Sequence, residues 1–209
     1  MNWTIASLLL LFAAVAAYLW MRWITAPPLD EPAAVASPFK FERTIAVHVS
    51  DRYFLELRFD RRDASFEALR SLVGGVHGQK VEKDGRLVDV GEPAGLLVPV
   101  LWSVRDADSR MVIASGSSDV LGSNSWSAAE VGRLLYQGDI EAGRYTFAAE
   151  LVSGLPEFRD IRARLLLSLS PPHAHSRIMG MYWLSALFVP LALLGFVVTA
   201  AIAAWKSWT

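Results

Sequence analysis

Two short polar stretches contain the residue types that most often bind metal ions. His173 and His175 are separated by one residue, so both imidazoles can reach one metal from an extended segment, but no third ligand stands nearby. Asp106, Asp108 and Asp119 could offer carboxylates to calcium, yet this loop lacks the roughly six to eight oxygen ligands that such a site needs. We therefore predict no metal site and no cofactor.

The sequence contains no recognisable setting for a catalytic nucleophile. Combinations of Ser, Asp and His can be drawn, but no Gly-x-Ser-x-Gly turn supports any of them. The absence of cysteine excludes disulfides, thiol catalysis and thiolate metal sites. The glycine-rich residues 74–78 neither follow a strand nor open a strong helix, so they do not predict a phosphate-binding loop. No catalytic residues are predicted, and an unrecognised hydrolase is the least favoured function.

A long polar loop, residues 115–127, has the composition of many ligand-binding surfaces. It combines serine, glycine and Asn124 with one tryptophan, Trp126. An aromatic ring among small polar residues is typical of surfaces that bind carbohydrate or peptide. The structural alternative, which we favour, is that Trp126 packs as a hydrophobic staple before a helix cap at Ser127. Trp126 and Asn124 are the candidate ligand or partner residues.

Alternating apolar residues predict the scaffold that positions these groups. Period-2 alternation indicates antiparallel strands with one buried face, and it occurs at residues 39–49, 53–59, 96–104, 145–151 and 161–170. Residues 80–82 and 87–90 are weaker strand candidates. Residues 50–52 predict a tight hairpin between the first two strands. Residues 111–114 are expected to pair with the strand at 96–104.

Two short helices are expected between these strands. Asp63 is the expected cap of the first, in which apolar residues repeat at helical spacing from Phe66 until Gly74 ends the helix. Residues 127–130, Ser-Ala-Ala-Glu, form a capping box and predict a second helix through about Tyr136. The fold class predicted from these elements is mainly β: an antiparallel β-sandwich with two short helices.

A Gly-x-Tyr motif, Gly143 to Tyr145, precedes one of the predicted strands. It is similar to the tyrosine corner of immunoglobulin- and fibronectin-like sandwiches, in which the tyrosine hydroxyl bonds to nearby backbone and pins a crossing between sheets. Gly143 and Tyr145 are therefore interpreted as a structural corner.

The order of features in residues 39–170 also resembles an uncharacterised group of small bacterial envelope β-sandwich domains. The alternation in residues 53–59, the Gly91-x-Pro93 turn and the Gly-x-Tyr motif carry the resemblance. The chain departs from that group in having an apolar helix at each end. The resemblance implies a fold and no active or binding site.

Two apolar segments, one near each end of the chain, predict transmembrane helices. Each extends about 30–35 Å as a helix, which matches the hydrocarbon thickness of a bilayer. Small residues at Ala13 and Ala17, and at Gly195 and Thr199, could join the two spans to each other or to partner helices. Tryptophans, which favour the membrane–water boundary, bracket both segments as interface anchors: Trp3, Trp20, Trp23, Trp183, Trp205 and Trp208.

The predicted organisation follows from these segments. It comprises a transmembrane helix (1–25), a proline- and alanine-rich linker (26–38), the β-sandwich domain (39–170), a second linker (171–178) and a second transmembrane helix (179–205). The first helix is expected to be retained and not cleaved as a signal, because no Lys or Arg precedes it and its apolar run exceeds a usual signal core.

Charge and topology lead to the functional prediction. The stretch between the helices has a net charge of −3, which gives no reason to expect nucleic acid. By analogy with a common envelope layout, we expect a two-pass protein of the bacterial inner membrane, with both termini cytoplasmic and the domain in the periplasm. The leading prediction is a non-enzymatic protein that binds or scaffolds another membrane or envelope protein. The alternative is a glycan- or peptide-recognition module centred on Trp126.

Overall fold

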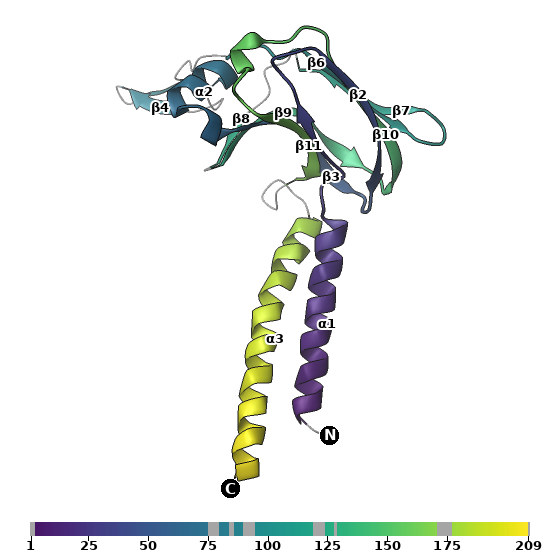
Figure 1. Cartoon of the computed structure of the whole chain (residues 1–209), viewed down its shortest axis with the longest axis vertical. Helices are drawn as coiled ribbons and strands as arrows, with labels where there is room; N and C mark the ends of the chain where they lie inside the picture. The colour runs from purple at the N-terminus through teal and green to yellow at the C-terminus, as the bar shows by residue number, and fades with distance from the viewer. Residues whose placement is uncertain are drawn as a thin grey trace. The chain divides into compact units, whose positions relative to one another are not determined.

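The computed structural model describes residues 3–74, 80–83, 86–89, 95–118, 124–127, 129–170 and 177–208. The chain divides into two compact units (Figure 1). One unit joins the two ends of the chain, Met1–Ala26 and Leu169–Thr209, and the other is Pro27–Ser168.

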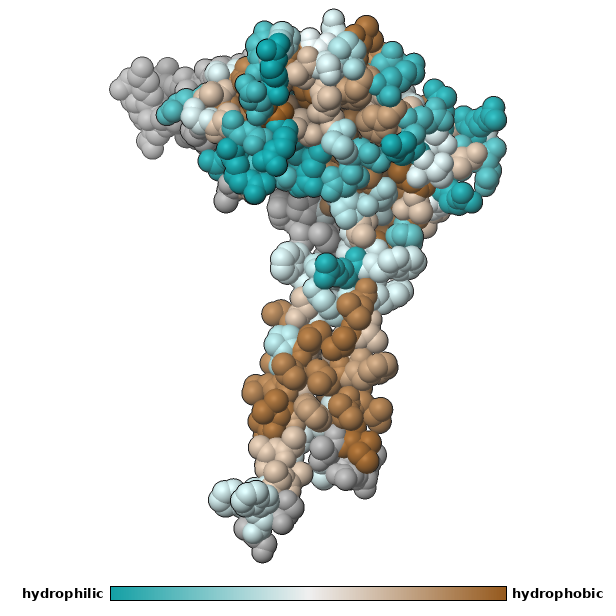
Figure 2. Space-filling model, viewed as in Figure 1, coloured by the Kyte–Doolittle hydropathy of each residue, from teal (hydrophilic) through white to brown (hydrophobic). Residues whose placement is uncertain are grey.

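The first unit is a pair of long helices, α1 (Trp3–Ile24) and α3 (Arg177–Trp208), that pack side by side (Figure 1). Both are long and apolar enough to cross a membrane, over residues 5–24 and 181–206. Figure 2 shows hydrophobic side chains along both helices. The tryptophans predicted as interface anchors are exposed near the helix ends: Trp3, Trp20, Trp23, Trp183, Trp205 and Trp208.

Two side-chain contacts set the antiparallel register of the helix pair. The hydroxyl oxygens of Ser7 and Thr199 share a hydrogen bond of 2.7 Å. The rings of Tyr18 and Tyr182 stack with centroids 5.9 Å apart. Thr199 thus joins the two spans to each other, one of the two roles expected for the small-residue faces. Gly195 takes no part in close packing, because a Cβ at this position would meet no atom within 4 Å.

The second unit contains two antiparallel sheets and a small hairpin. The five-stranded sheet has the order β1 (Leu29–Ala33), β11 (Ala163–Leu169), β3 (Asp51–Asp60), β9 (Glu130–Ile140) and β8 (Asn124–Trp126). The four-stranded sheet has the order β2 (Phe39–Val47), β10 (Gly143–Leu151), β6 (Val100–Asp106) and β7 (Val112–Ser117). The hairpin pairs β4 (Lys80–Lys83) with β5 (Arg86–Asp89). Three short helices complete the unit: η1 (Arg61–Asp63), α2 (Phe66–Val73) and η2 (Pro156–Phe158).

Alternation places the apolar side chains of both sheets in one core. Every second residue of β10 is buried, from Tyr145 through Phe147 and Ala149 to Leu151. The ring of Trp102 on β6 lies 5.2 Å from that of Tyr136 on β9, so the two sheets meet at this contact. The prediction of a mainly β chain with antiparallel strands is confirmed, as are the pairing of β6 with β7 and the two weaker strands, β4 and β5, which pair with each other.

The second of the two predicted helices is wrong, because residues 130–140 form β9. Only the serine half of the predicted capping box forms: the Ser127 hydroxyl accepts hydrogen bonds from the backbone N–H groups of Ala129 and Glu130. The Glu130 carboxylate binds Arg58 and Arg164 instead. The chain then continues as a strand that pairs with β3 from one end to the other and buries Val131 and Ile140. Pairing along a whole strand outweighs a local turn signal.

The segment expected to be a spacer, residues 26–38, contributes β1 instead. This strand pairs with β11 from Leu29 to Ala33, and both of these residues are buried. Leu29 and Ala33, four residues apart, fill the edge of the core. Two apolar residues among prolines are too short a pattern to predict a strand from sequence. Of the second predicted linker, residues 171–176 lie outside the described residues, and Arg177 already begins α3.

Two local interpretations also change. Residues 50–52 do not close a hairpin: β2 pairs with β10 and β3 pairs with β9, so the turn crosses from one sheet to the other. Asp63 does not cap α2. The Ser65 hydroxyl accepts the N–H of Ala68 at the start of that helix, while the Asp63 carboxylate binds Arg162.

Candidate functional site

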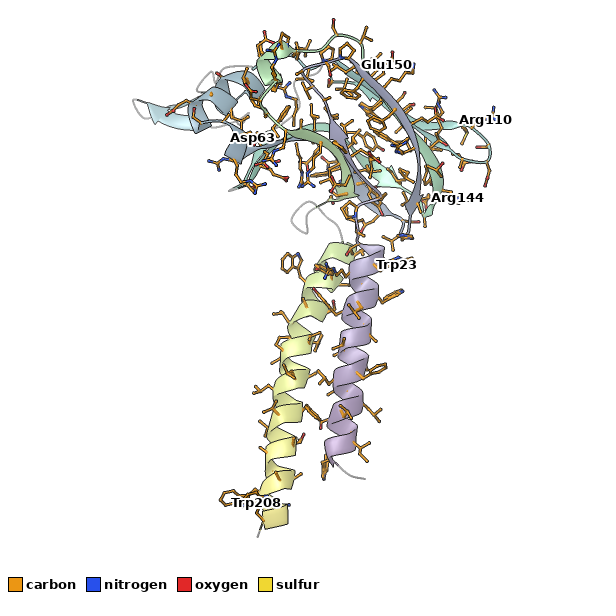
Figure 3. The ribbon with its side chains drawn as sticks, in the orientation of Figure 1. Trp23, Asp63, Arg110, Arg144, Glu150 and Trp208 are labelled. Atoms are coloured by element: carbon orange, nitrogen blue, oxygen red, sulfur yellow. The ribbon has the colours of Figure 1, made fainter. Side chains whose placement is uncertain are left out.

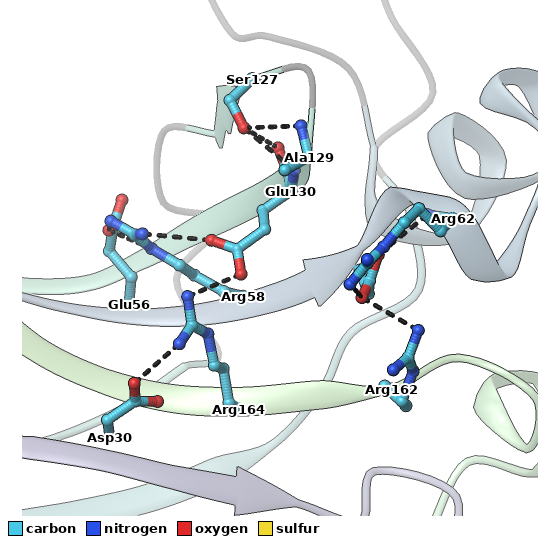
Figure 4. A network of polar contacts seen from close by, with 10 residues as sticks. Asp30, Glu56, Arg58, Arg62, Ser127, Ala129, Glu130, Arg162 and Arg164 are labelled. Atoms are coloured by element: carbon cyan, nitrogen blue, oxygen red, sulfur yellow. Dashed lines mark hydrogen bonds and ion pairs between the residues drawn. The ribbon is translucent and has the colours of Figure 1, made fainter.

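A network of ion pairs crosses the outer face of the five-stranded sheet (Figure 4). Arg164 of β11 donates to Asp30 of β1 at 2.7 Å and to Glu130 of β9 at 2.6 Å. Arg58 of β3 bonds to the other oxygen of Glu130 and, at 2.6 Å, to the buried Glu56. Because Glu56 also accepts from Ser125 of β8, the network joins all five strands.

A second cluster ties η1 to the start of β11. Asp60 accepts from Arg62 at 2.7 Å and lies 3.1 Å from Arg162. Asp63 accepts from the side chain and the backbone N–H of Arg162. These hydrogen bonds, from Arg62 to Asp60 and from Arg162 to Asp63, hold the pKa of both carboxyls below the usual value.

An open groove of about 600 Å³ runs between these two clusters. Arg58, Arg62, Arg162 and Arg164 line it together with carboxylates. Each guanidinium already lies within 2.8 Å of a carboxylate, so the positive charges are neutralised inside the network. The groove therefore suits a structural role, holding the strands in register, better than capture of an anion.

Arg133 of β9 is a buried cation that bonds to backbone and not to a carboxylate among the described residues. It is about 1 % exposed. Its guanidinium donates to the carbonyl of Leu96 at 2.8 Å and to that of Val73, the last residue of α2. Burial lowers the pKa of the guanidinium. Arg133 satisfies a carbonyl at the helix end and anchors α2 to the sheet.

Gly143 and Tyr145, interpreted as a structural corner, lie at the start of β10. The Tyr145 hydroxyl donates to the carbonyl of Glu141 at 2.9 Å. Tyr53 makes the same bond to Val49 at the start of β3, also at 2.9 Å, and its burial raises its pKa. Each tyrosine thus closes a turn that crosses between the sheets.

The two crossing turns are also joined to each other. The backbone N–H of Ala142, in the turn from β9 to β10, donates to the hydroxyl of Ser50, in the turn from β2 to β3. One end of the two-sheet unit is therefore held by three hydrogen bonds that involve side chains. This is an architectural arrangement and not a binding site.

The structure separates the residues that the sequence offered for ligand binding. Asn124 and Trp126 both lie on β8, where Trp126 is opposite Val131, and their side chains lie outside the description. Asp106 caps the turn after β6 by accepting from Asp108 and Ser109. His77, Asp119, His173 and His175 lie outside the described residues. Within the described ranges, no group of three or more His, Asp or Glu side chains could hold a metal ion.

The β6–β7 hairpin presents three exposed apolar side chains in succession. Met111, Val112 and Ile113 are 62 %, 51 % and 39 % exposed. Figure 3 labels Arg110 at the turn of this hairpin, where its φ of 57° places it in the left-handed region. Hydrogen bonds from Ser109 to the Asp106 carboxylate, which lower the pKa of that group, close the turn.

The base of the hairpin is fixed as well. Ser118, directly after β7, is buried, and its hydroxyl accepts from the N–H of Val100 and donates to the carbonyl of Val98. Its own N–H donates to the carbonyl of Val100. A hairpin bound at both ends holds β7 in an extended, ordered form.

Among the described edges of the two larger sheets, β7 differs in having neither charge nor proline over residues 112–116, while a bulge at Ile113 interrupts its pairing with β6. Edge strands are usually protected by charge, proline, short length or a covering element. β1 contains Asp30, Glu31 and Pro32; β2 contains Lys40, Glu42 and Arg43; β8 is three residues long. In contrast, residues 112–116 of β7 have neither charge nor proline. We take this strand, with the exposed residues before it, as the candidate functional site.

Sequence reasoning missed both the charged network and this edge. The network had a readable signal, since charged residues alternate with buried ones at Arg58 and Asp60 and at Arg162 and Arg164. No sequence signal marks β7 as an edge strand, because its position at an edge depends on the order of strands that are distant in sequence.

Comparisons with known proteins do not assign the chain to a family. No family model matches it, and no curated protein does so. Among solved structures it is similar to a crystal structure of a protein from Sulfurospirillum deleyianum, at 16 % identity and a TM-score of 0.48. The similarity covers 68 % of this chain and 96 % of the other. The resemblance to envelope β-sandwich domains stays a prediction.

Proposed function

We propose that this chain is a non-catalytic integral membrane protein whose β-sandwich binds a partner protein through strand β7. In this proposal α1 and α3 cross the inner membrane of a bacterium, both termini are cytoplasmic, and the sandwich lies in the periplasm. The observation that carries the proposal is that the edge strand β7 has neither charge nor proline over residues 112–116 and lies next to the exposed Met111, Val112 and Ile113.

The physics of an edge strand supports a protein partner over a small ligand. Outward N–H and C=O groups of an edge form a row of donors and acceptors spaced to match another extended chain. Apolar side chains beside that row add area that becomes buried when a strand pairs with it. The ion pairs on the five-stranded sheet satisfy one another, which leaves β7 as the stronger docking candidate.

A pair of matched variants tests the site. Ser115 on β7 and Thr44 on β2 are both exposed hydroxyl residues on the two edge strands of one sheet. We expect Ser115→Lys to abolish co-purification of a stoichiometric partner with the full chain in mild detergent, because a lysine protects an edge from pairing. Thr44→Lys, on an edge that is already charged, should leave the partner bound.

Loss of the partner from both variants, or from neither, would contradict a β7 docking site. Topology is tested separately. Reporters that are active only in the cytoplasm, fused after Thr209 and before Met1, should both be active. Activity of a periplasmic reporter at either end would refute the proposed orientation.

A further inference from the structure

We propose that the segment bound by β7 presents an aromatic side chain opposite Gly116, and that this side chain packs against Tyr136 of the other sheet. The inference rests on the proposed function, since it takes β7 as the docking edge. It adds the chemistry that a partner needs there, because pairing of backbones gives affinity while side chains beside the edge give specificity. Gly116 and Tyr136 are the specificity-determining residues, and Trp102 positions the Tyr136 ring.

The hydrogen-bond pattern of β7 determines which of its residues face a partner strand. The N–H of Ser118 donates to the carbonyl of Val100, so by the alternation of an antiparallel ladder the backbone groups of Gly116 also point toward β6. Those of Ser115 point away from β6. A strand that pairs antiparallel with Ser115 then has a residue directly opposite Gly116, with the two Cα atoms about 4.5 Å apart and no hydrogen bond between them.

The partner residue opposite Gly116 faces the inside of the two-sheet unit. Gly116 is opposite the buried Trp102 within its own sheet, and residues opposite one another lie on the same face. Gly116 is exposed and has no side chain, while a Cβ here would lie 3.0 Å from the Trp102 ring. The partner's side chain is thus the one that lies over this position, and aromatic side chains are the type that packs over an edge glycine.

Tyr136 is the ring that such a side chain meets. It is half-buried and contacts Trp102. Its opposite residue on β3, Leu55, is buried, so the exposed part of Tyr136 lies on the side away from β3. On that side β8 pairs only with residues 131–133 of β9, and no other described strand lies next to Tyr136 in this sheet. Because β7 contacts β9, the exposed side of Tyr136 lies along the same border of the unit as the β7 edge.

The spacing of the sheets favours an aromatic side chain over a smaller one. Packed sheets lie about 10 Å apart, and side chains from both inner faces usually fill that gap. A strand added to β7 has no described strand opposite it beside Tyr136, so its inward side chain must bridge more than half of the gap. An aromatic ring reaches further than an aliphatic side chain, and tilted or offset contacts with another ring add to the gain from burial.

Selection of phage-displayed random peptides on the full chain in mild detergent tests this inference. We expect the selected peptides to share alternating apolar residues with one aromatic residue at a fixed position. Synthetic copies of these peptides should lose binding to Ser115→Lys, in which a lysine protects the edge, and should keep binding to Thr44→Lys. Fluorescence anisotropy of labelled peptides measures the affinity.

A double-mutant cycle tests the contact with Tyr136. Tyr136→Ala, and separately replacement of the peptide's aromatic residue by alanine, should each weaken binding at least about tenfold, because each removes the same ring contact. Together the two changes should weaken binding little more than either change alone. Tyr136→Phe is the matched control, because it keeps the ring, and it should bind the peptide as the natural chain does.

Gly116→Ala is a second variant, which leaves Tyr136 unchanged. Its methyl group occupies the position over which the partner's ring lies, so it should weaken binding of the aromatic peptide at least about threefold and binding of the alanine peptide less. A single cooperative thermal unfolding transition, close to that of the natural chain, shows that each variant is folded.

Selected peptides that need Ser115 but share no aromatic residue, or additive losses in the cycle, would overturn the aromatic contact and leave β7 docking in place. If no selected peptide loses binding to Ser115→Lys, both proposals fail.

Discussion

Arg133 shows how a single buried side chain can connect distant parts of this fold. Its two carbonyl partners, Val73 and Leu96, are 60 and 37 residues away in sequence. A buried carbonyl that loses its donor costs about 1–3 kcal/mol, and hydrogen bonds to charged groups are stronger than neutral ones. Arg133 is therefore a residue whose removal should affect more than its own strand.

We expect Arg133→Met to lower the free energy of unfolding by about 2–3 kcal/mol, because a buried carbonyl and a half-buried one lose a donor. The free energy of unfolding of Arg133→Lys should lie between that of the natural chain and that of Arg133→Met. The lysine ammonium is a compact donor and lacks the planar, forked donor geometry of a guanidinium. Denaturant unfolding of the full chain in detergent measures both. Arg105→Met, at an exposed position, is the control, and an Arg133→Met effect no larger than the control would contradict the anchor role.

The two corner tyrosines allow a second prediction at this scale. Tyr145→Phe and Tyr53→Phe each remove one hydroxyl bond to backbone while keeping the buried ring, so each should cost about 1 kcal/mol. Tyr136→Phe serves as a comparison, because its hydroxyl has no hydrogen bond within the described residues. Equal free energies of unfolding for the natural chain and the three variants, measured by denaturant unfolding, would show that the two tyrosine hydroxyl bonds add no stability.

Residue-level prediction from sequence succeeds here where the partner is close along the chain. Tyr145 could be identified because its acceptor, Glu141, is four residues away and Gly-x-Tyr is a compact motif. The role of Arg133 could not, since its partners Val73 and Leu96 are 60 and 37 residues away in sequence. The type of the residue is visible in sequence, while its contact depends on strand order.

At the scale of elements, ion pairs connect segments that would otherwise be separate. Asp60 at the end of β3 and Asp63 of η1 both pair with Arg162, which directly precedes β11. Their pKa values are lower in the folded chain than the ordinary 3.8 expected when unfolded. The stability they contribute is thus present above about pH 4 and is lost as the pH falls below it.

We expect the melting temperature of the full chain to fall between about pH 4 and pH 2, and less steeply in the Asp60→Asn, Asp63→Asn double variant. The double variant should be the less stable protein at pH 7. Thermal unfolding followed by tryptophan fluorescence checks both. Parallel pH profiles for the two proteins would contradict a contribution from these carboxylates.

The helix pair permits a prediction of its own. Ser7 and Thr199 share one hydrogen bond between α1 and α3. A double-mutant cycle with Ser7→Ala and Thr199→Ala in bicelles should give a coupling energy of about 0.6 kcal/mol, the usual size for such bonds between membrane helices. A coupling of zero would mean that the packing of the helices does not depend on this contact.

Strands could be predicted wherever apolar residues alternate over a long stretch. The predictions failed where a short local signal competed with that alternation. β3 and β10 followed directly from alternating buried residues. At residues 127–130 the capping box predicted a helix, and the hydrogen bonds to the Ser127 hydroxyl do form, yet pairing with β3 determined what followed. β1 was missed because five residues with one proline give no recognisable period.

At the scale of the whole molecule, two parts of the two-sheet unit differ in charge: the outer face of the five-stranded sheet and the edge strand β7. The charged side chains on the outer face of the five-stranded sheet form ion pairs with one another, so that face needs no partner to neutralise its charges. The four-stranded sheet ends in β7, which has neither charge nor proline over residues 112–116. This contrast is a property of strand order, so the sequence could reveal the residues of β7 and not their position at an edge.

Amide hydrogen exchange of β7 in the full chain tests the central claim most directly. If β7 pairs with another strand, its outward amides should exchange at least about tenfold more slowly in native membranes than in dilute detergent, because they are hydrogen-bonded in the assembly. The edge strand β2 should exchange at similar rates in both. Equally fast exchange of residues 112–116 in both conditions would contradict the assignment of β7 as the binding edge.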